Sequence, residues 1–505
     1  MLNKTKIVKN HLRKLVISGK VTNCVIRELI RGVIFSMSKE TRGRQVRHPK
    51  LAMVSMLLGA FVGMFSETSL NIALPKLILA FHVNTATIQW LVTGYMLVIG
   101  IVLPLSSLIS KWFTTRQIII FALVDFIVGA VISAMAGNFP VLLIGRMIQG
   151  IGTGLILPLM FAVVMQIFPP QKIGAVMGVC ALVIMFAPAI GPTLTGLILA
   201  KLSWNWIFWL FVPFLVIALI FAITSLENVG DITRPHVDVL SILESAVGCS
   251  GLVIGASLSS RDGWLSAPVL GALVIGVVVL AFYVHRQLHL ETPILNLRVF
   301  KTPAFAIGST LVMLDFGIIL SAMYLLPMYI QNGLLLPVAL TGIIMLPGGV
   351  VNALTSAVAG RMYDSVGAKR PAMIGFIIAL IGAGMLALTS DHSSIAYVIA
   401  AHVILMIGCP LAMSPSQTSA LNSLSGMESA DGSTILNTMQ QIVGALATAL
   451  ATSFLELGRT AATGSSAVRF TNGVHWGLYF TLVLVIVGIV LTFKMTDKPH
   501  SNDLK

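Results

Sequence analysis

Charged residues are scarce in this sequence. Asp, Glu, Lys and Arg make up 10% of its 505 residues, while 57% are hydrophobic and the mean hydropathy is +0.96. Soluble domains carry about 25% charged residues. The scarcity of charge therefore excludes an ordinary soluble domain and predicts an all-α polytopic membrane protein.

Paired cysteines, nucleotide-binding loops and long connections are also missing. The four cysteines are scattered and suggest neither disulfides nor a metal cluster. No Walker-type loop occurs, and connections as short as residues 137–139 leave no room for a soluble catalytic domain. We therefore expect no enzyme activity, no metal and no bound cofactor. No short apolar leader with a cleavage site precedes the first long apolar run, so we expect no cleaved signal peptide.

Long apolar runs are what the sequence has instead. Fourteen runs reach about 20 residues, which is enough for a helix to cross a bilayer. They cover residues 51–75, 88–110, 116–136, 140–166, 173–199, 205–224, 238–258, 267–284, 304–331, 337–360, 371–389, 395–414, 432–455 and 474–494. The sequence thus predicts fourteen transmembrane helices.

Short basic connections recur after the second run, at residues 108–116, and after the tenth, at 360–370. This repetition indicates two six-helix halves separated by a pair of linker helices. The predicted domains are a basic tail, an N-terminal bundle, a linker pair with its loops, a C-terminal bundle and a second tail. Their expected bounds are residues 1–50, 51–224, 225–300, 301–494 and 495–505.

Lysine and arginine predict the orientation. With the N-terminus inside, inner segments beyond residue 50 carry thirteen Lys and Arg, and outer connections carry five. The outer five are Lys76, Lys201, Arg261, Arg459 and Arg469. We therefore expect a multi-pass protein of the inner or plasma membrane with both termini in the cytoplasm.

The N-terminal tail is strongly basic. Residues 1–50 hold thirteen Lys and Arg against Glu28 and Glu40, which accounts for +11 of the net charge of +14. This predicts attraction to anionic lipid rather than to nucleic acid, and residues 21–35 are amphipathic enough to lie on a membrane surface. Met37 is an alternative start, which would make residues 1–36 an upstream extension without function.

Glu67 is the most informative residue. It lies roughly 25 Å along the first apolar run, at about 1.5 Å per residue. Insertion of a centrally placed acid costs about 2.5–3.5 kcal/mol, so such an acid usually has a function. Glu67 therefore predicts proton or cation handling. The alternative is a protonated acid that only hydrogen-bonds a neighbouring helix.

Arg146 is the one Lys or Arg well inside a predicted span, roughly 9 Å from its end. It should face the bundle interior and meet an acid, carbonyls or water. Gln149 lies one turn further on and shares its face. The alternative to a role in proton release is a purely structural arginine clamp.

Further acids lie within the runs. Asp315 lies about eleven residues into the ninth run, near the midplane, where transporter sites lie. Asp125 lies about nine residues into the third run, and a proton-path role is weighed for it. Glu244 begins the seventh run, where an interfacial position explains it equally well.

Two groups of uncharged residues are also candidates. The fifth run combines glycine with proline at Pro188, Gly191, Pro192 and Gly196, which predicts a thin, kinked helix that serves as a hinge or a sealing surface. Its alternative is ordinary tight packing. Aromatic faces attract lipophilic cations, and the aromatic residues expected to line a cavity are Phe65, Trp90, Tyr95, Phe316 and Tyr324.

Several of these strings resemble motifs of the major facilitator superfamily. Gly360-x-x-x-Asp364-x-x-Gly367-x-x-Arg370 resembles its cytoplasmic loop motif, and Gly145-Arg146-x-x-Gln149-Gly150-x-Gly152-x-Gly154 looks like its fourth-span arginine motif. Gly191-Pro192 with Gly196 looks like its antiporter motif. The string around Glu67 is similar to that of fourteen-span drug:proton antiporters, especially bacterial lincomycin and quaternary-ammonium exporters. The resemblance covers about residues 50–495.

The resemblance implies a major facilitator fold, with two six-helix bundles and two extra linker helices. It implies proton-coupled efflux of lipophilic, often cationic drugs by alternating access in a monomer driven by the proton gradient. Glu67, Asp315 and Arg146 would serve protons and substrate, with Gln149 and the aromatic residues around the cavity, whereas no motif surrounds Asp125. Ser110 and Phe113 depart from the loop motif, which shifts gating to Gly360, Asp364, Gly367 and Arg370. The alternative is a transporter of a specific metabolite, including an uptake symporter.

Overall fold

A computed structural model describes residues 49–168, 170–228, 232, 238–290, 293–424 and 426–495. The predictions for the two tails fall on residues 1–48 and 496–505 and lie outside these ranges. The described long helices are α3 (Pro49–Phe81), α5 (Trp90–Trp112), α6 (Thr115–Ala134), α7 (Phe139–Ile167), α8 (Pro170–Lys201), α9 (Asn205–Ser225), α10 (Val239–Asp262), α11 (Ala267–His289), α12 (Pro303–Met328), α13 (Val338–Val366), α14 (Lys369–Ala387), α15 (Ile395–Asn422), α16 (Gly426–Ala461) and α17 (Ser466–Thr492). Short helical turns are α4 (Thr85–Ile88), η1 (Leu297–Lys301) and the π-helical η2 (Tyr329–Gly333).

The all-helical prediction is confirmed, because every predicted run corresponds to one of these fourteen long helices. Thirteen described helices are long and apolar enough to cross a membrane, and α8 adds the shorter apolar stretch Phe186–Lys201. Several helices run past the predicted spans: α3 continues to Phe81 and α16 begins at Gly426. These helices continue beyond the apolar run until they reach a residue whose backbone conformation ends the helix. For α3 that residue is His82, whose φ is 53°.

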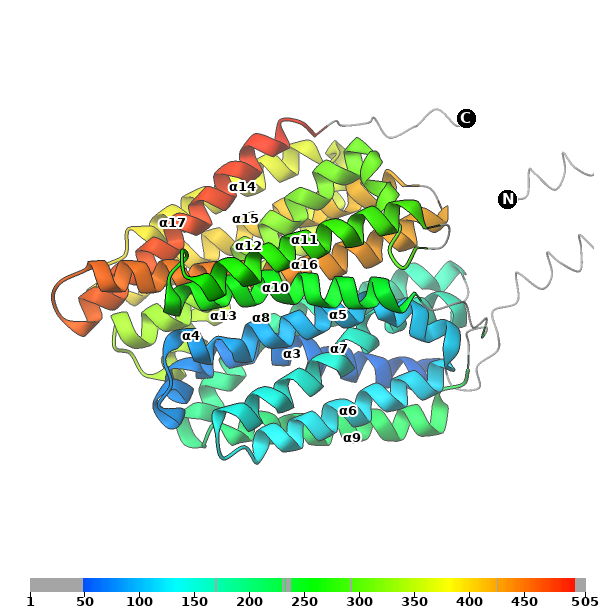
Figure 1. The fold of residues 1–505 in the computed structure, drawn as a ribbon, viewed down its shortest axis with the longest axis horizontal. Coiled ribbons are helices and arrows are strands. Elements are labelled where there is room, and N and C mark those ends of the chain that lie inside the picture. The colour runs from blue at the N-terminus through cyan, green and yellow to red at the C-terminus, as the bar shows by residue number, and fades with distance from the viewer. Residues whose placement is uncertain are drawn as a thin grey trace, which may run out of the picture.

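The long helices lie side by side, and the start of α3 and the end of α17 lie at the same end of the molecule (Figure 1). We call this end the terminal end and the opposite one the far end. Helices α3 and α5 to α9 pack against one another, as do α12 to α17. We call these groups the N-terminal and C-terminal bundles. They meet along two seams, α8 against α13 and α5 against α16.

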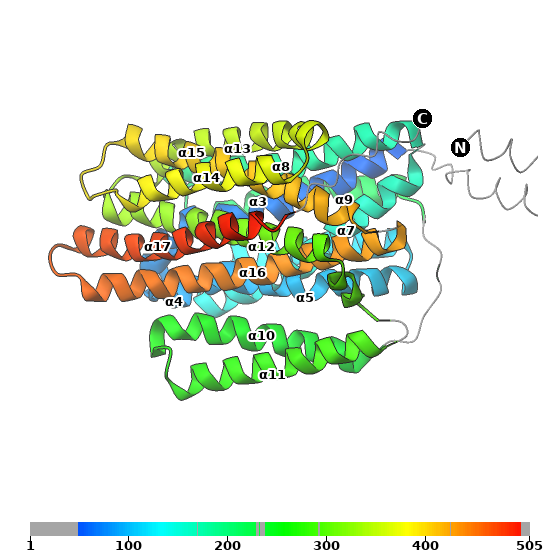
Figure 2. The ribbon, with the colours of Figure 1, turned by 90° about the horizontal axis from the view of Figure 1, so that it is seen from above.

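Helices α10 and α11 form a hairpin outside both bundles (Figure 2). Glycines allow the two helices to approach closely, because a Cβ added to Gly251 would lie 2.7 Å from Cα of Gly276. Helix α10 packs against α16 and α5, whereas α11 packs against α10 and η1. The apolar side chains on the outer face of α11 are exposed, as expected of a helix that faces lipid.

A polar cluster ties this hairpin together at its terminal end. Arg286 of α11 donates two hydrogen bonds of 2.9 Å to the Asp238 carboxylate, which also accepts from Ser241 at 2.5 Å. Asp238 precedes the span of α10, and the Arg286 guanidinium lowers its pKa to about 2. Gln287 donates to Ser241 at 2.7 Å and accepts from the backbone N–H of Ile294 at 2.8 Å. The cluster therefore anchors the chain that leads into α12.

Candidate functional site

Arg146 lies at the centre of a hydrogen-bond network within the N-terminal bundle. It is fully buried, and its guanidinium donates to the carbonyls of Leu91 and Ser66 at 3.2 Å each. It also donates to the side chains of Ser66 and Gln149, the latter at 2.7 Å. The guanidinium thus faces the bundle interior and meets carbonyls, on the face that it shares with Gln149.

Tyr95 completes this network from α5. The guanidinium carbon of Arg146 lies 4.0 Å from the centre of the Tyr95 ring, a cation–π distance. The Tyr95 hydroxyl donates to the Gly63 carbonyl at 3.0 Å and lies 2.7 Å from Oγ1 of Thr153. These hydroxyl contacts therefore hold the Tyr95 ring in place against the Arg146 guanidinium.

Glu67 lies on α3 beside this network and is 2% exposed. The Arg146 charge and the side-chain amide of Gln441 on α16 both act on its carboxyl. Its Oε2 atom has no partner among the described residues. Because α3 and α16 belong to different bundles, Glu67 lies at the contact between the two halves of the molecule.

Asp315 occupies a different environment in the C-terminal bundle. It is fully buried on α12, and the thiol of Cys409 on α15 faces it. Neither carboxyl oxygen has a well-formed hydrogen bond with a described residue. The two acids therefore have separate neighbours: Glu67 faces an amide across the bundle contact, and Asp315 faces a thiol inside one bundle.

Asp125 lies at the α6–α7 contact, away from the guanidinium. Its Oδ2 atom lies 3.3 Å from the position of a Cβ added to Gly152, and Oδ2 has no partner among the described residues. Gly152 is thus what lets this carboxyl approach α7. The structure brings Arg146, Gln149, Tyr95 and Glu67 together and leaves Asp125 at the side of that group.

The remaining aromatic candidates are divided between the bundles. Phe65 packs within the N-terminal bundle, with its ring edge-on to Phe211 at 5.7 Å. Trp90 begins α5, and its side chain is half-buried. Phe316 and Tyr324 of α12 face α16, where Phe316 would meet a Cβ added to Gly444 at 2.9 Å and Tyr324 faces Thr452.

The fifth long helix, α8, combines the predicted proline and glycine residues with a specific compensation. Pro192 has no N–H, so the carbonyl of Pro188 has no donor one turn on. Thr68 of α3 donates to that carbonyl at 3.4 Å. A Cβ on Gly191 would lie 2.6 Å from the same threonine hydroxyl, so the glycine is needed for this approach.

Glycines also close the α8–α13 seam toward the far end. A Cβ on Gly196 would lie 3.0 Å from the Val338 carbonyl, and one on Gly342 would lie 2.8 Å from the Pro192 carbonyl. Thr193 donates to the Gly342 carbonyl at 2.9 Å. These contacts hold α8 against α13 toward the far end. The middle of α13 is less covered, because each of residues 349–356 is at least partly exposed.

The predicted gating loop joins α13 to α14 at the terminal end. Gly367 ends α13 with φ of 79°, a conformation that side chains disfavour. A Cβ on Gly360 would meet nothing within 4 Å. Arg370 is exposed in the first turn of α14. The Asp364 side chain lies outside the part of the chain that the structure describes, so its gating role stays a prediction.

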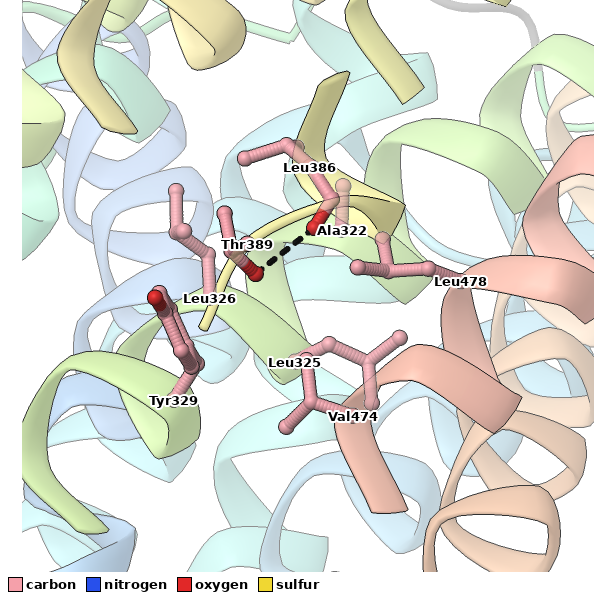
Figure 3. Close-up of a pocket in the computed structure, with 8 residues that line it drawn as sticks. All are labelled: Ala322, Leu325, Leu326, Tyr329, Leu386, Thr389, Val474 and Leu478. Carbon is pink, nitrogen blue, oxygen red and sulfur yellow. Dashed lines mark hydrogen bonds between the residues drawn. The ribbon is translucent and has the colours of Figure 1, made fainter. Parts of the chain in front are cut away.

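A small apolar pocket lies inside the C-terminal bundle, between α12, α14 and α17 (Figure 3). Leu325, Leu386 and Leu478 line it, and Thr389 at its edge donates to the Leu386 carbonyl at 2.8 Å. Its volume is about 10 Å³. Drug-sized sites need about 300–1,000 Å³, so this pocket is a packing gap rather than a substrate chamber.

The sequence interpretation did not single out Gln441, although it faces Glu67. It also omitted Gln331, whose amide donates to the Ile72 carbonyl across the two bundles at 3.1 Å. The available signal was an amide within an apolar run. An amide is far cheaper to bury than a charge, so it draws less attention.

The profile of the family described as Major Facilitator Superfamily matches residues 56–448. Lincomycin resistance protein LmrB of Listeria innocua is 42% identical over 462 residues, covering 90% of this chain and 98% of the relative. LmrB of Bacillus subtilis is 44% identical over 454 residues, covering 88% and 95%.

Among solved structures, the xylose transporter XylE from E. coli, in a partially occluded inward-open conformation, superimposes with a TM-score of 0.60. The match covers 90% of this chain and 99% of that one at 15% identity. At this identity the likeness concerns the fold alone.

Proposed function

Since this chain belongs to the major facilitator superfamily, we propose that it is a multidrug exporter that exchanges protons for lipophilic, often cationic compounds. The observation that carries the proposal is a carboxyl, Glu67, buried where the two bundles meet and beside a buried arginine. Identity above 40% with proteins named for lincomycin resistance supports the drug class. We propose that the chain acts as a monomer and is not an enzyme.

The proposed orientation puts the terminal end in the cytoplasm. The excess of Lys and Arg in the segments at that end supports it. In this orientation the end at which α8 and α13 are held together faces outward. The structure then corresponds to an inward-facing or occluded stage of alternating access, with 51–224 and 301–494 as the two moving bundles and 225–300 as their linker.

The proposed cycle uses Glu67 and Asp315 as proton carriers. Each takes a proton when its surroundings open outward, and each loses it when a cationic drug enters from the inside, because the positive charge of the drug favours the ionised, negatively charged form of the carboxyl. The Arg146 guanidinium favours proton release from Glu67 in the same way. One charge moving through 100 mV supplies about 2.3 kcal/mol, or nearly fifty-fold accumulation.

The roles of the remaining predicted residues follow from their positions. Gln149 and Tyr95 hold Arg146, while Trp90, Phe316 and Tyr324 are the proposed cavity aromatics, with Phe65 supporting them from within the N-terminal bundle. Asp125 is proposed as a side branch of the proton path. The loop with Gly360, Asp364, Gly367 and Arg370 is the proposed cytoplasmic gate, and the basic tail is proposed to bind anionic lipid.

The test compares Glu67→Gln and Asp315→Asn with the unmodified chain in inverted vesicles. Proton-driven drug uptake into these vesicles should fall at least tenfold in each variant at unchanged membrane levels, because an amide cannot carry the proton. Asp391→Asn, which changes an acid in the far loop between α14 and α15, is the matched control. Full proton-dependent transport by both amide variants, or a substrate that moves in the same direction as protons, contradicts the proposal.

A further inference from the structure

The linker hairpin, α10 with α11, is packed as one unit along its length. A Cβ on Gly248 of α10 would lie 2.6 Å from Cγ of Leu280, and one on Gly255 would lie 2.6 Å from Cγ of Leu273, both on α11. The ion pair described above joins the same two helices at the terminal end. The hairpin therefore moves as one body, and the question is which bundle it moves with.

The chain that leaves the hairpin is bonded back to it. Arg298 of η1 donates hydrogen bonds to the carbonyls of Leu288 and Leu290, at 3.0 Å each. Gln287 of α11 accepts a hydrogen bond from the backbone N–H of Leu295 at 3.2 Å. The start of η1 is therefore held against the end of α11.

The same segment is also part of the core of the C-terminal bundle. Leu295 and Val299 are buried in an apolar cluster with Phe305 and Val312 of α12 and Ile435 of α16. Helix η1 packs against both of these helices. The terminal end of the hairpin is thus fixed to the C-terminal bundle through a short, buried connection.

A second attachment lies nearer the far end. Ser259, in the last turn of α10, donates a hydrogen bond to the hydroxyl of Ser453 on α16 at 3.2 Å, and both residues are buried. Helix α10 packs more extensively against α16 than against α5. The hairpin is therefore attached to the C-terminal bundle near both of its ends.

The surface that the hairpin shares with the N-terminal bundle is smaller and differs in character. It consists of contacts of α10 with α5 and with the short turn α4. Helix α5 is largely apolar, and its one charged residue, Lys111, lies in its last turn. Contacts between apolar side chains are non-directional, so such a surface can shift more easily than one that is held by hydrogen bonds.

We propose that the α10–α11 hairpin belongs to the C-terminal bundle as a moving body and slides over α5 when the two bundles rock. The inference rests on the proposed rocking of the bundles, and it adds which of them carries the linker. The α16 side of the α5–α16 seam would then stay covered at every stage of the cycle.

The first experiment measures distances between spin labels in the full chain in lipid nanodiscs. The labels are attached to cysteines at three exposed positions near the far end: Met135 of the N-terminal bundle, Leu265 of the hairpin and Leu388 of the C-terminal bundle. Each chain carries two of the substitutions Met135→Cys, Leu265→Cys and Leu388→Cys, in a parent that has alanine at the native cysteines and still transports drug. Distances are recorded at pH 5 and pH 8, with and without the lipophilic cation tetraphenylphosphonium.

The three distances should respond differently. The Met135–Leu388 distance, between the bundles, should change with pH or with the cation, and the Leu265–Met135 distance should change under the same conditions. The Leu265–Leu388 distance should stay constant, because both labels move with one body. A Leu265–Leu388 distance that changes overturns the inference, whether or not the hairpin then follows Met135.

The second experiment measures transport when the hairpin is covalently tied to α16. Sulfur atoms in the chain with Ser259→Cys and Ser453→Cys need to approach only slightly to form a disulfide of about 2.0 Å. Oxidation should leave the rate of drug transport within twofold of the rate in the reduced chain. A hairpin that moved with the N-terminal bundle would tie the bundles together, so loss of transport on oxidation contradicts the inference. The two single-cysteine chains, treated with the same oxidant, are the controls.

The failure of the inference can be told apart from that of the function on which it rests. A between-bundle distance that changes while the hairpin follows Met135 overturns the inference and leaves the rocking intact. A between-bundle distance that stays constant in every condition overturns the proposed rocking and the inference with it.

Discussion

A guanidinium inside a helical bundle needs an acceptor for each of its nitrogens. Arg146 finds acceptors on α3, α5 and α7, and the Tyr95 ring covers its face. A lysine is a single charge on a flexible stem and cannot satisfy this planar arrangement. The shape of the side chain is therefore as important here as its charge.

Arg146→Lys should lower both transport and stability. Breaking a buried polar network typically costs about 3–5 kcal/mol, so we expect at least a tenfold loss of initial efflux rate and a lower melting temperature. Rates are normalised to protein in the membrane. Arg469→Lys, at an exposed arginine near the far end, should behave as the unmodified chain, and wild-type rates in Arg146→Lys would show that charge alone suffices.

Sequence reasoning located charges well and their partners poorly. Glu67, Arg146 and Asp315 stand out because burial of a charge is costly. The pairing of Arg146 with Gln149 followed from helical spacing, since residues three apart share a face. Gln441 lies 374 residues from Glu67, and Cys409 lies 94 residues from Asp315, so no local spacing connects either residue to the acid beside it.

At the scale of helices, the α8–α13 seam depends on the absence of side chains. A Cβ at Gly342 would lie 2.8 Å from both the Pro192 carbonyl and Cα of Thr193. Backbone atoms cannot move aside as a flexible side chain would, so an alanine here must separate the helices. Alanine is a better helix former than glycine, which means that loss of helix stability would not explain a defect.

Gly342→Ala should hold the far end open. We expect transport to fall about tenfold and a cysteine at the buried Thr341 to react faster with a membrane-impermeant maleimide. Labelling is compared with Gly342→Ala chains that keep Thr341. Gly384→Ala is the control, because a Cβ there meets nothing within 4 Å; an unchanged labelling rate in Gly342→Ala would refute the seal.

The Asp238–Arg286 pair predicts a pH-dependent stability of the linker hairpin. Its folded pKa of about 2 lies below the usual 3.8, so its contribution is complete above pH 4 and is lost as pH falls toward 2. Asp238→Asn should therefore lower the melting temperature at pH 7 and lower it less at pH 3. In a double-mutant cycle, Arg286→Gln should add little once Asp238 is changed.

The helices themselves were predictable and their neighbours were not. About twenty apolar residues specify a membrane helix because the bilayer leaves few alternatives for the backbone. Lipid-facing and protein-facing side chains are both apolar, so the pattern does not show which helices meet. The seams α8–α13 and α5–α16 and the π-helical turn η2 therefore come from the structure.

At the scale of the whole molecule, charge is concentrated at one end of the chain. The first 50 residues carry +11 of the total charge of +14. Each Lys or Arg near an anionic surface contributes about 1 kcal/mol of attraction. This charge is the basis of the proposal that the tail binds anionic lipid.

Removal of residues 1–36 should leave drug export per molecule unchanged within about twofold in neutral vesicles. In vesicles with anionic lipid, the full chain should differ from one that starts at Met37, because eight of the basic residues are lost. Proteoliposomes of defined composition measure both rates. Identical behaviour in the two lipids would favour the interpretation that residues 1–36 have no function.

The position of the α10–α11 hairpin makes the molecule lopsided with respect to its surroundings. One flank, along α5 and α16, lies behind an additional layer of protein, whereas α8 and α13 meet without one. A lipophilic compound dissolved in the bilayer would therefore meet one flank that the hairpin covers and one flank that it leaves exposed. Entry of such a compound from the bilayer should favour the α8–α13 flank. The hairpin would then make the two flanks of the transporter unequal within the plane of the membrane.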